Sequence, residues 1–298
     1  MLFERQKLLV ALLNALGGSI GNLDFQKLLF LYCDEHPELT LYEFVPYHYG
    51  AFSFTSYDDR RRLIKHKALE QDDRRWELTR QGERIAFRAA HAFQGLGDFA
   101  KRYARLRGDK LVAETYRRRP YYAILSEVVE RVLAGDSAAL AAVADARKRC
   151  SESGLVTIGY EGRSLESFLN LLFREGVSIL CDVRRNPLSR KYGFSKGTLS
   201  KVCAGLGIRY EHLPELGVAS ENRRGLDSAS DYKRLFALYR AAVLPSQSLA
   251  LEQIASWVAA GHRVALTCYE EAPTLCHRHC VAEALEARSE AALRTTHL

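Results

Sequence analysis

The chain has 298 residues, a mass of 33.7 kDa and a formal net charge of +7 at pH 7. Its length suits two domains, and its 47% hydrophobic and 27% charged residues are typical of globular proteins, which excludes a fibrous or largely disordered chain. No apolar run reaches the roughly 18 residues of a membrane span, and no cleavage-site pattern follows the apolar start, so we expect neither a membrane anchor nor a signal peptide. Seven cysteines without dense, even spacing favour a reducing, cytoplasmic location.

Positive charge is concentrated in the first half of the sequence. Residues 60–119 contain 18 lysines and arginines against 8 acidic residues, a local balance of +10, whereas residues 151–298 contain 18 against 16. Such a concentration is typical of a surface that binds a polyanion, and DNA is the partner we expect. A solvated basic face without a partner is the simpler alternative.

The residue pattern changes near position 150, which predicts one domain over 1–150 and a second over 151–298. Before this point the pattern is helical and basic, and Ala134–Cys150 is typical of a final helix. Ser151–Gly154 follows as the predicted joint, and beyond it short apolar strands alternate with helices.

The first half predicts helices followed by a small hairpin. Apolar residues recur at helical spacing over Glu4–Leu16 and Asp24–Asp34, and a third helix is predicted over Ser56–Lys65. Leu69–Thr79 then contains two short strand-like segments around a polar turn, and a further helix opens at Arg80. Three helices followed by a hairpin are the order of a winged-helix domain.

Basic side chains lie where a winged helix contacts the backbone of a DNA duplex. The third helix and the tip of the hairpin are these positions. The predicted DNA-binding residues are Arg60, Arg61, Arg62, Lys65, Arg74 and Arg75. The alternative is a purely structural hairpin with a helix that packs against a partner protein.

The same region resembles a known family. The segments KLLFLY, within Phe25–Tyr32, and YHYGAFS, within Phe44–Ser53, are similar to those of the Panacea domain, which is related to the SocA antitoxin. The resemblance covers about residues 5–85. It implies a toxin–antitoxin or phage-defence context, and it does not imply catalysis.

The second half predicts a parallel sheet. Short apolar strands are expected at Leu155–Gly159, Val177–Cys181, Ile208–Tyr210 and Arg263–Cys268, with helices between them such as Leu165–Glu175. Strands and helices that alternate at this spacing are typical of an α/β domain with a Rossmann-like, three-layer arrangement. The fold prediction is therefore an α/β C-terminal domain preceded by a mainly α-helical, winged-helix-like N-terminal domain.

Polar side chains gather where the predicted strands end. These residues are Tyr160 and Glu161, Asp182 with Arg184 and Arg185, Glu211 and His212, and Tyr269 with Glu270. Ligands of open parallel sheets bind outside the carboxyl ends of the strands. We therefore expect these ends to converge on one site, although polar loop residues are also common without a site.

The motifs around these strand ends resemble the domain-of-unknown-function 488 family. The similar segments are TIGYEG, CDVRRNPLSR, YEHLPELG and ALTCYEEAPTLCHR, together with Gly193 and Phe194, in the same order over residues 155–287. The resemblance implies a compact α/β fold and no settled reaction. Glu161 departs from the family pattern, which has serine or threonine there, and it adds a carboxylate to the site.

The arginines of this half predict a phosphate-containing ligand, because guanidinium groups bind phosphates in a bidentate manner. Arg184, Arg185 and Arg190 follow one strand, and Arg278 follows another. The aromatic rings could hold a base taken out of its stack. The remaining predicted substrate-binding residues are Tyr160, Phe194, His212 and Tyr269. No phosphate loop or dinucleotide motif is present in the sequence.

Three carboxylates are the candidate catalytic groups. Asp182, Glu161 or Glu270 could orient a water molecule or stabilise the sugar cation during cleavage of an N-glycosidic bond, without a metal or cofactor. The sequence therefore favours a DNA glycosylase-type enzyme that acts in phage defence. A metal-dependent nuclease is one alternative, and a non-catalytic, antitoxin-like DNA-binding regulator is another.

The cysteines of the last strand and the last helix could serve as metal ligands or as nucleophiles. Cys268, Cys276 and Cys280 lie near two histidines, His277 and His279. Their C-x₇-C-H-x-H-C spacing differs from the short cysteine pairs of structural zinc sites. We therefore expect no metal. A cysteine nucleophile next to His277 is an equally minor alternative.

Overall fold

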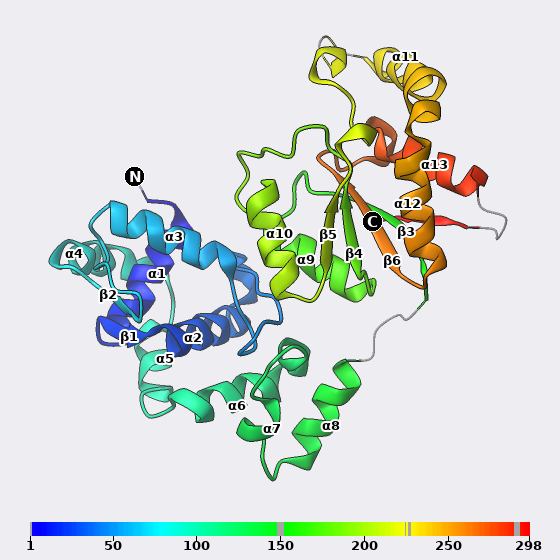
Figure 1. Cartoon of the computed structure of the whole chain (residues 1–298). Coiled ribbons are helices and arrows are strands. Elements are labelled where there is room, and N and C mark those ends of the chain that lie inside the picture. Colours follow the sequence, from blue (N-terminus) through cyan, green and yellow to red (C-terminus); the bar gives the residue numbers. More distant parts are fainter. Residues whose placement is uncertain (1, 148–151, 224, 226–227, 289–292) are drawn as a thin grey trace. The chain divides into compact units, whose positions relative to one another are not determined.

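The structure is a computed structural model that describes residues 2–147, 152–223, 225, 228–288 and 293–298. It divides into two compact units, Met1–Lys148 and Arg149–Leu298, which are described separately below (Figure 1). Within the described residues, no helix is both long and apolar enough to cross a membrane.

The first unit is mainly helical. Its helices are α1 (Glu4–Ala15), α2 (Asn22–Glu35), α3 (Phe54–Lys65), α4 (Arg80–Ala89), α5 (Leu96–Arg102), α6 (Gly108–Arg118), α7 (Val129–Val132) and α8 (Ser137–Ala146). Apolar faces of α1 and α2 form its core, because Leu8 to Leu13 and Leu28 to Leu31 are almost completely buried. The final helix, α8, is shorter than the predicted helix Ala134–Cys150. Cys150, and residue 151 of the predicted joint, lie outside the described residues.

Two short strands accompany α1, α2 and α3. β1 (Ser19–Gly21) pairs antiparallel with β2 (Arg75–Glu77), and an isolated bridge joins Leu69 to Leu78. The order is thus helix, strand, two helices and a hairpin. Phe25 of α2 stacks on Trp76 of β2 at 4.2 Å, so the hairpin is anchored to the helical core.

Arg60 corrects the predicted DNA-binding surface. Arg60 is only 8% exposed. Its guanidinium donates hydrogen bonds to the carbonyl oxygens of Asp72 and Arg75, and it lies 5.2 Å from the centre of the Trp76 ring. The sequence could not show this, because Arg60 belongs to the same run of basic residues as its exposed neighbours. Arg60 therefore holds the hairpin against α3 and does not face solvent.

The second unit contains a five-stranded parallel sheet. Its strands are β3 (Gly154–Gly159), β4 (Ile179–Asp182), β5 (Arg209–His212), β6 (Arg263–Cys268) and β7 (Thr295–His297), in the order β5-β4-β6-β3-β7. All pairs are parallel, which confirms the α/β prediction. The helices are α9 (Leu165–Arg174), α10 (Lys196–Gly205), α11 (Ala229–Leu238), α12 (Ser248–Ala259) and α13 (Arg278–Arg288).

The sheet is buried on both faces. Leu155, Ile179 and Leu266 share one apolar cluster with Leu251 of α12 and Leu285 of α13. Alternate strand residues point to the other face of a sheet, which is where α9 and α10 pack (Figure 1). This two-sided cover leaves the carboxyl ends of the strands as the open edge of the sheet.

Candidate functional site

A pocket of about 310 Å³ lies at the carboxyl ends of β3, β4 and β6. Its lining includes five predicted substrate-binding residues and one cysteine: Tyr160, Arg184, Arg185, Arg190, Tyr269 and Cys268. Because β4, β6 and β3 are neighbours in the sheet, residues from distant parts of the sequence meet here. None of the described residues that line it is an Asp or a Glu. We expected the predicted carboxylates in this lining, and the structure places them outside it.

Asp182 is completely buried at the end of β4 and is fully hydrogen-bonded. Its Oδ1 accepts from the Arg184 backbone N–H at 3.1 Å and from Arg184 Nε at 2.8 Å. Its Oδ2 accepts from Arg184 Nη2 at 2.5 Å and from the Tyr210 hydroxyl at 2.6 Å. Four such bonds saturate a carboxylate. Asp182 is thus built to orient Arg184.

The buried ion pair also fixes the protonation of its neighbours. Burial lowers the pKa of Arg184, but the hydrogen bonds and the charge of Asp182 outweigh it, so the net shift is upward. Burial, followed by the Asp182 charge, raises the pKa of Tyr210. Tyr210 therefore keeps its proton and donates a hydrogen bond to Asp182. The remaining Arg184 nitrogen, Nη1, donates to the Tyr160 hydroxyl at 2.8 Å.

The aromatic rings differ sharply in accessibility. Phe194 is completely buried and stacks on Tyr160, with ring centroids 4.3 Å apart and planes at 9°. Its predicted role as an open face for a base is therefore wrong, because Tyr160 and Phe168 cover it. Tyr269 is 45% exposed and meets the Tyr160 ring edge-on at 5.3 Å. Tyr269 is the ring that a ligand can reach.

Glu270 and Glu161 lie on the loop after β6 and the loop after β3. Glu270 is half-buried, and its Oε2 lies 3.3 Å from the sulfur of Cys268, which lines the 310 Å³ pocket. Glu270 also lines an adjacent pocket of about 220 Å³ together with His277. Glu161 accepts a hydrogen bond from the Glu271 backbone at 3.0 Å, and its charge raises the pKa of Tyr269. Glu270 is therefore the carboxylate next to both pockets.

The loop after β6 is held by a buried arginine and by a glycine. Arg278 is completely buried, and its guanidinium donates to the carbonyl oxygens of Glu270 at 2.5 Å and Glu271 at 2.7 Å. Gly159 packs so closely against the same loop that an added Cβ would lie 1.8 Å from the Glu270 carbonyl oxygen. Arg278 was predicted to bind substrate. Its burial instead makes it a positioning residue for this loop.

His212, at the end of β5, is outside the lining of the pocket. Its Nε2 lies 2.9 Å from the carbonyl oxygen of Arg184, and its Nδ1 lies 3.1 Å from Lys196 Nζ. His212 thus contacts the backbone of Arg184, a pocket residue, without itself facing the pocket.

Sequence reasoning missed the roles of Tyr210 and His277. Tyr210 lies inside β5 rather than after it, so it was read as part of a strand. His277 is 1% exposed, and its Nε2 lies 2.9 Å from the carbonyl oxygen of Val183, directly after β4. The parallel register of β4 and β6 brings these segments together, and the C-x₇-C-H-x-H-C pattern, which was the signal in the sequence, does not show the contact with Val183.

In the first unit, the remaining predicted DNA-binding residues are exposed. They are Arg61, Arg62, Lys65, Arg74 and Arg75. Asp58 pairs with both Arg61 and Arg62 at 3.0 Å, so part of this charge is already balanced within the unit. Arg75 Nε donates a hydrogen bond to the Ser19 hydroxyl at 3.0 Å.

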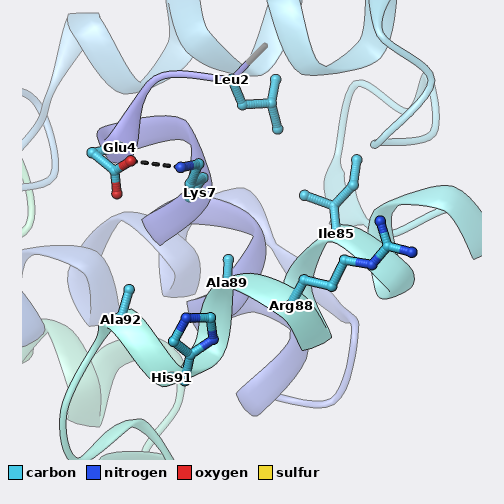
Figure 2. A pocket seen from close by; sticks show the side chains of 8 residues that line it. All are labelled: Leu2, Glu4, Lys7, Ile85, Arg88, Ala89, His91 and Ala92. Carbon is cyan, nitrogen blue, oxygen red and sulfur yellow. Dashed lines mark hydrogen bonds and ion pairs between the residues drawn. The ribbon is translucent and has the colours of Figure 1, made fainter.

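A pocket of about 360 Å³ also lies in the first unit, between the start of α1 and the end of α4. Figure 2 shows its lining, in which Glu4 and Lys7 pair at 2.5 Å while Leu2 and Ile85 present apolar side chains. None of the predicted site residues lies in it.

The fold and this edge of the sheet define an α/β protein with its candidate site at the carboxyl ends of parallel strands. Residues 164–285 match the family described as "Domain of unknown function DUF488", which supports the resemblance of the second half. No curated protein matches the chain significantly. The resemblance of residues 5–85 to the Panacea domain receives no support from these comparisons.

Proposed function

We propose that this protein is a DNA-acting enzyme whose second unit hydrolyses N-glycosidic bonds. The observation that carries the proposal is the pocket at the carboxyl ends of β3, β4 and β6, where arginine and tyrosine side chains meet beside Glu270. Arginines suit the phosphates of a nucleotide, and an exposed ring suits a base that has left its stack. A pocket of about 310 Å³ is of the size that small-molecule ligands occupy.

The roles follow from exposure and contacts. Arg185 and Arg190 are exposed and bind phosphates, whereas Tyr269 stacks on the base. Glu270 takes the proton from a water molecule as the oxygen bonds to C1′ of the sugar. The C1′–N bond breaks, and the base leaves with its electron pair and takes up one proton from solvent, to which Glu270 releases the proton that it took. Asp182 orients Arg184 in this scheme, because its lone pairs are already used.

The first unit supplies duplex binding in this proposal. Its support is the basic surface of α3 and the hairpin, where Arg61, Lys65 and Arg74 are exposed. The Panacea-like segments would place the protein in phage defence. A reducing cytoplasm is the location that we propose, because the sequence lacks the dense, even cysteine spacing of a disulfide-linked protein.

The test is the formation of abasic sites in DNA. We would incubate the full-length protein with ordinary duplex DNA and with modified phage DNA, and count abasic sites with an aldehyde-reactive probe. We expect abasic sites in at least one DNA. Glu270→Gln should lower the rate by about 10²–10⁴-fold, the usual contribution of a positioned acid or base.

Glu271→Gln is the matched control, because it removes the same charge one residue further on, where the side chain is exposed. Its rate should equal that of the wild type. Absence of abasic sites from both DNAs sinks the enzymatic proposal and favours a non-catalytic binder. Strand breaks that disappear with a chelator would instead indicate a nuclease.

A further inference from the structure

Two thiols and one imidazole lie close together next to the candidate site. Cys268 is the last residue of β6, and Cys276 and His277 directly precede α13. All three are at most 1% exposed. Their ligand atoms lie within 4.8 Å of one another, although seven residues separate the two cysteines in the sequence.

We infer that Cys268, Cys276 and His277 form a binding site for a zinc ion. This inference goes beyond the proposed function and does not depend on it. Thiolates and imidazole are the ligands that zinc prefers, and three protein ligands leave one position of a tetrahedral ion for water.

The separations of the ligand atoms fit a tetrahedral ion. Zinc lies about 2.3 Å from sulfur and about 2.0 Å from nitrogen, so two such ligands at the tetrahedral angle are about 3.5 Å apart. His277 Nδ1 lies 3.9 Å from the sulfur of Cys268 and 3.9 Å from that of Cys276. Side-chain rotations close the remaining few tenths of an ångström between the nitrogen and each sulfur, and all three ligand atoms already lie within 4.8 Å of one another.

The histidine is already oriented as a ligand. His277 Nε2 lies 2.9 Å from the Val183 carbonyl oxygen, which can only accept a hydrogen bond. Nε2 therefore carries the proton, and the lone pair of Nδ1 points towards the two sulfurs. Histidines that bind metals are oriented in this way by a carbonyl or carboxylate on the other ring nitrogen.

Charge balance also favours zinc at this buried position. Two thiolates and neutral imidazole compensate the charge of Zn²⁺, so the complete site is neutral, as burial requires. A second group of potential ligands, His279, Cys280 and Glu283, behaves differently. Arg240 pairs with Glu283 at 2.6 Å and lies 3.0 Å from His279, and this cation occupies the place of a metal.

The C-x₇-C-H spacing argued against zinc because structural sites generally use short cysteine pairs. The fold removes this objection, since the segment between the cysteines turns back and returns Cys276 to the end of β6. Bound zinc would tie the end of β6 to the start of α13, next to Glu270 and Tyr269.

The test is zinc binding by the full-length protein, purified under reducing conditions. We expect one zinc per chain by elemental analysis. Replacement by Co²⁺ should give sulfur-to-cobalt charge-transfer absorption and the visible bands of a tetrahedral site. Loss of an outer-shell partner typically weakens metal binding by about 10–100-fold. Cys268→Ser and Cys276→Ser each remove a direct ligand, so each should weaken zinc binding by more than this.

Cys280→Ser is the matched control, because Cys280 is equally buried and lies in α13, yet the inference gives it no role. It should bind zinc like the wild type. Wild-type protein that binds no zinc in competition with a micromolar-affinity chelator overturns the inference even if the variants fail to fold. Loss of zinc in Cys280→Ser also overturns it. None of these readouts depends on abasic-site formation.

Discussion

Lys27 is a completely buried amine in α2, and its Nζ donates to the carbonyl oxygen of Ala51 at 2.8 Å. Burial lowers its pKa from 10.5 to about 7. Between these two values the unfolded chain binds more protons than the folded one, so this residue makes the free energy of unfolding rise with pH. Below pH 7 the folded state bears the full effect of the buried charge.

We therefore expect Lys27→Met to be more stable than the wild type near neutral pH, with an upper limit of about 5 kcal/mol, and to lose this advantage as the pH rises. Urea unfolding of both proteins between about pH 6 and pH 10 measures the difference. Parallel pH profiles of the two proteins would show that Lys27 is not the source of the slope.

Asp182 and Arg184 form the most buried ion pair of the second unit, with side chains 0% and 6% exposed. Asp182→Asn leaves the guanidinium buried without its counter-charge, so we expect the free energy of unfolding of this unit to fall by about 3–5 kcal/mol. Denaturant unfolding measures this change. Glu211→Gln, which removes a partly exposed pair with Arg209, should change it by less than about 1 kcal/mol.

At the scale of elements, the end of β3 controls the loop that contains Glu270. A Cβ at Gly159 would meet the Glu270 carbonyl oxygen, and backbone atoms cannot rotate away as a side chain does. Gly159→Ala should therefore displace the loop, lower the free energy of unfolding by about 1–3 kcal/mol and reduce the proposed activity. Thermal unfolding and abasic-site counts measure these effects.

Gly197→Ala in α10 is the control for this change, because an added Cβ there meets no atom within 4 Å. Alanine is the better helix former, so this variant should gain about 0.5–1 kcal/mol. A Gly159→Ala protein that behaves in the same way would exclude the close contact.

The sequence predicted most elements, because apolar periodicity marks both the buried strands and the amphipathic helices. β6 spans Arg263–Cys268 as expected. The helices α5, α6 and α7 were not predicted, and neither were the strands β1 and β7. Both strands are three residues long, and β7, with the sequence TTH, has no apolar alternation. Such strands form because a neighbouring strand offers its edge, and a single sequence does not show that neighbour.

At the scale of the whole molecule, DNA binding would depend on the exposed basic residues of α3 and the hairpin. Arg61→Ala removes one exposed guanidinium, so the slope of log affinity against log salt should fall by about 0.9. Fluorescence anisotropy over a range of salt concentrations measures the slope. Lys101→Ala, at an exposed position in α5 that the proposal does not use, should leave it unchanged.

The position of the site was predictable, but the roles within it were not. Parallel strands bring their carboxyl ends together, so Tyr160, Arg184 and Tyr269 could be grouped from the sequence alone. Burial then divided chemically similar residues, because Asp182 is enclosed while Glu270 lies beside the pockets. This division depends on packing between α9, α10 and the sheet, and residue type carries no information about it.

The hydrogen bonds from Tyr210 through Asp182 and Arg184 to Tyr160 connect three strands of the sheet. Each group in this series is held by the one before it. A ligand that displaces the Tyr160 hydroxyl therefore also changes the hydrogen bonds of Arg184, Asp182 and Tyr210, the last of which lies in β5. The series thus gives the sheet edge a preferred arrangement before any ligand arrives, and it makes the energetic effects of substitutions at its two ends non-additive. Selectivity in such a site would be set as much by the inner hydroxyl of Tyr210 as by the residues that a ligand touches.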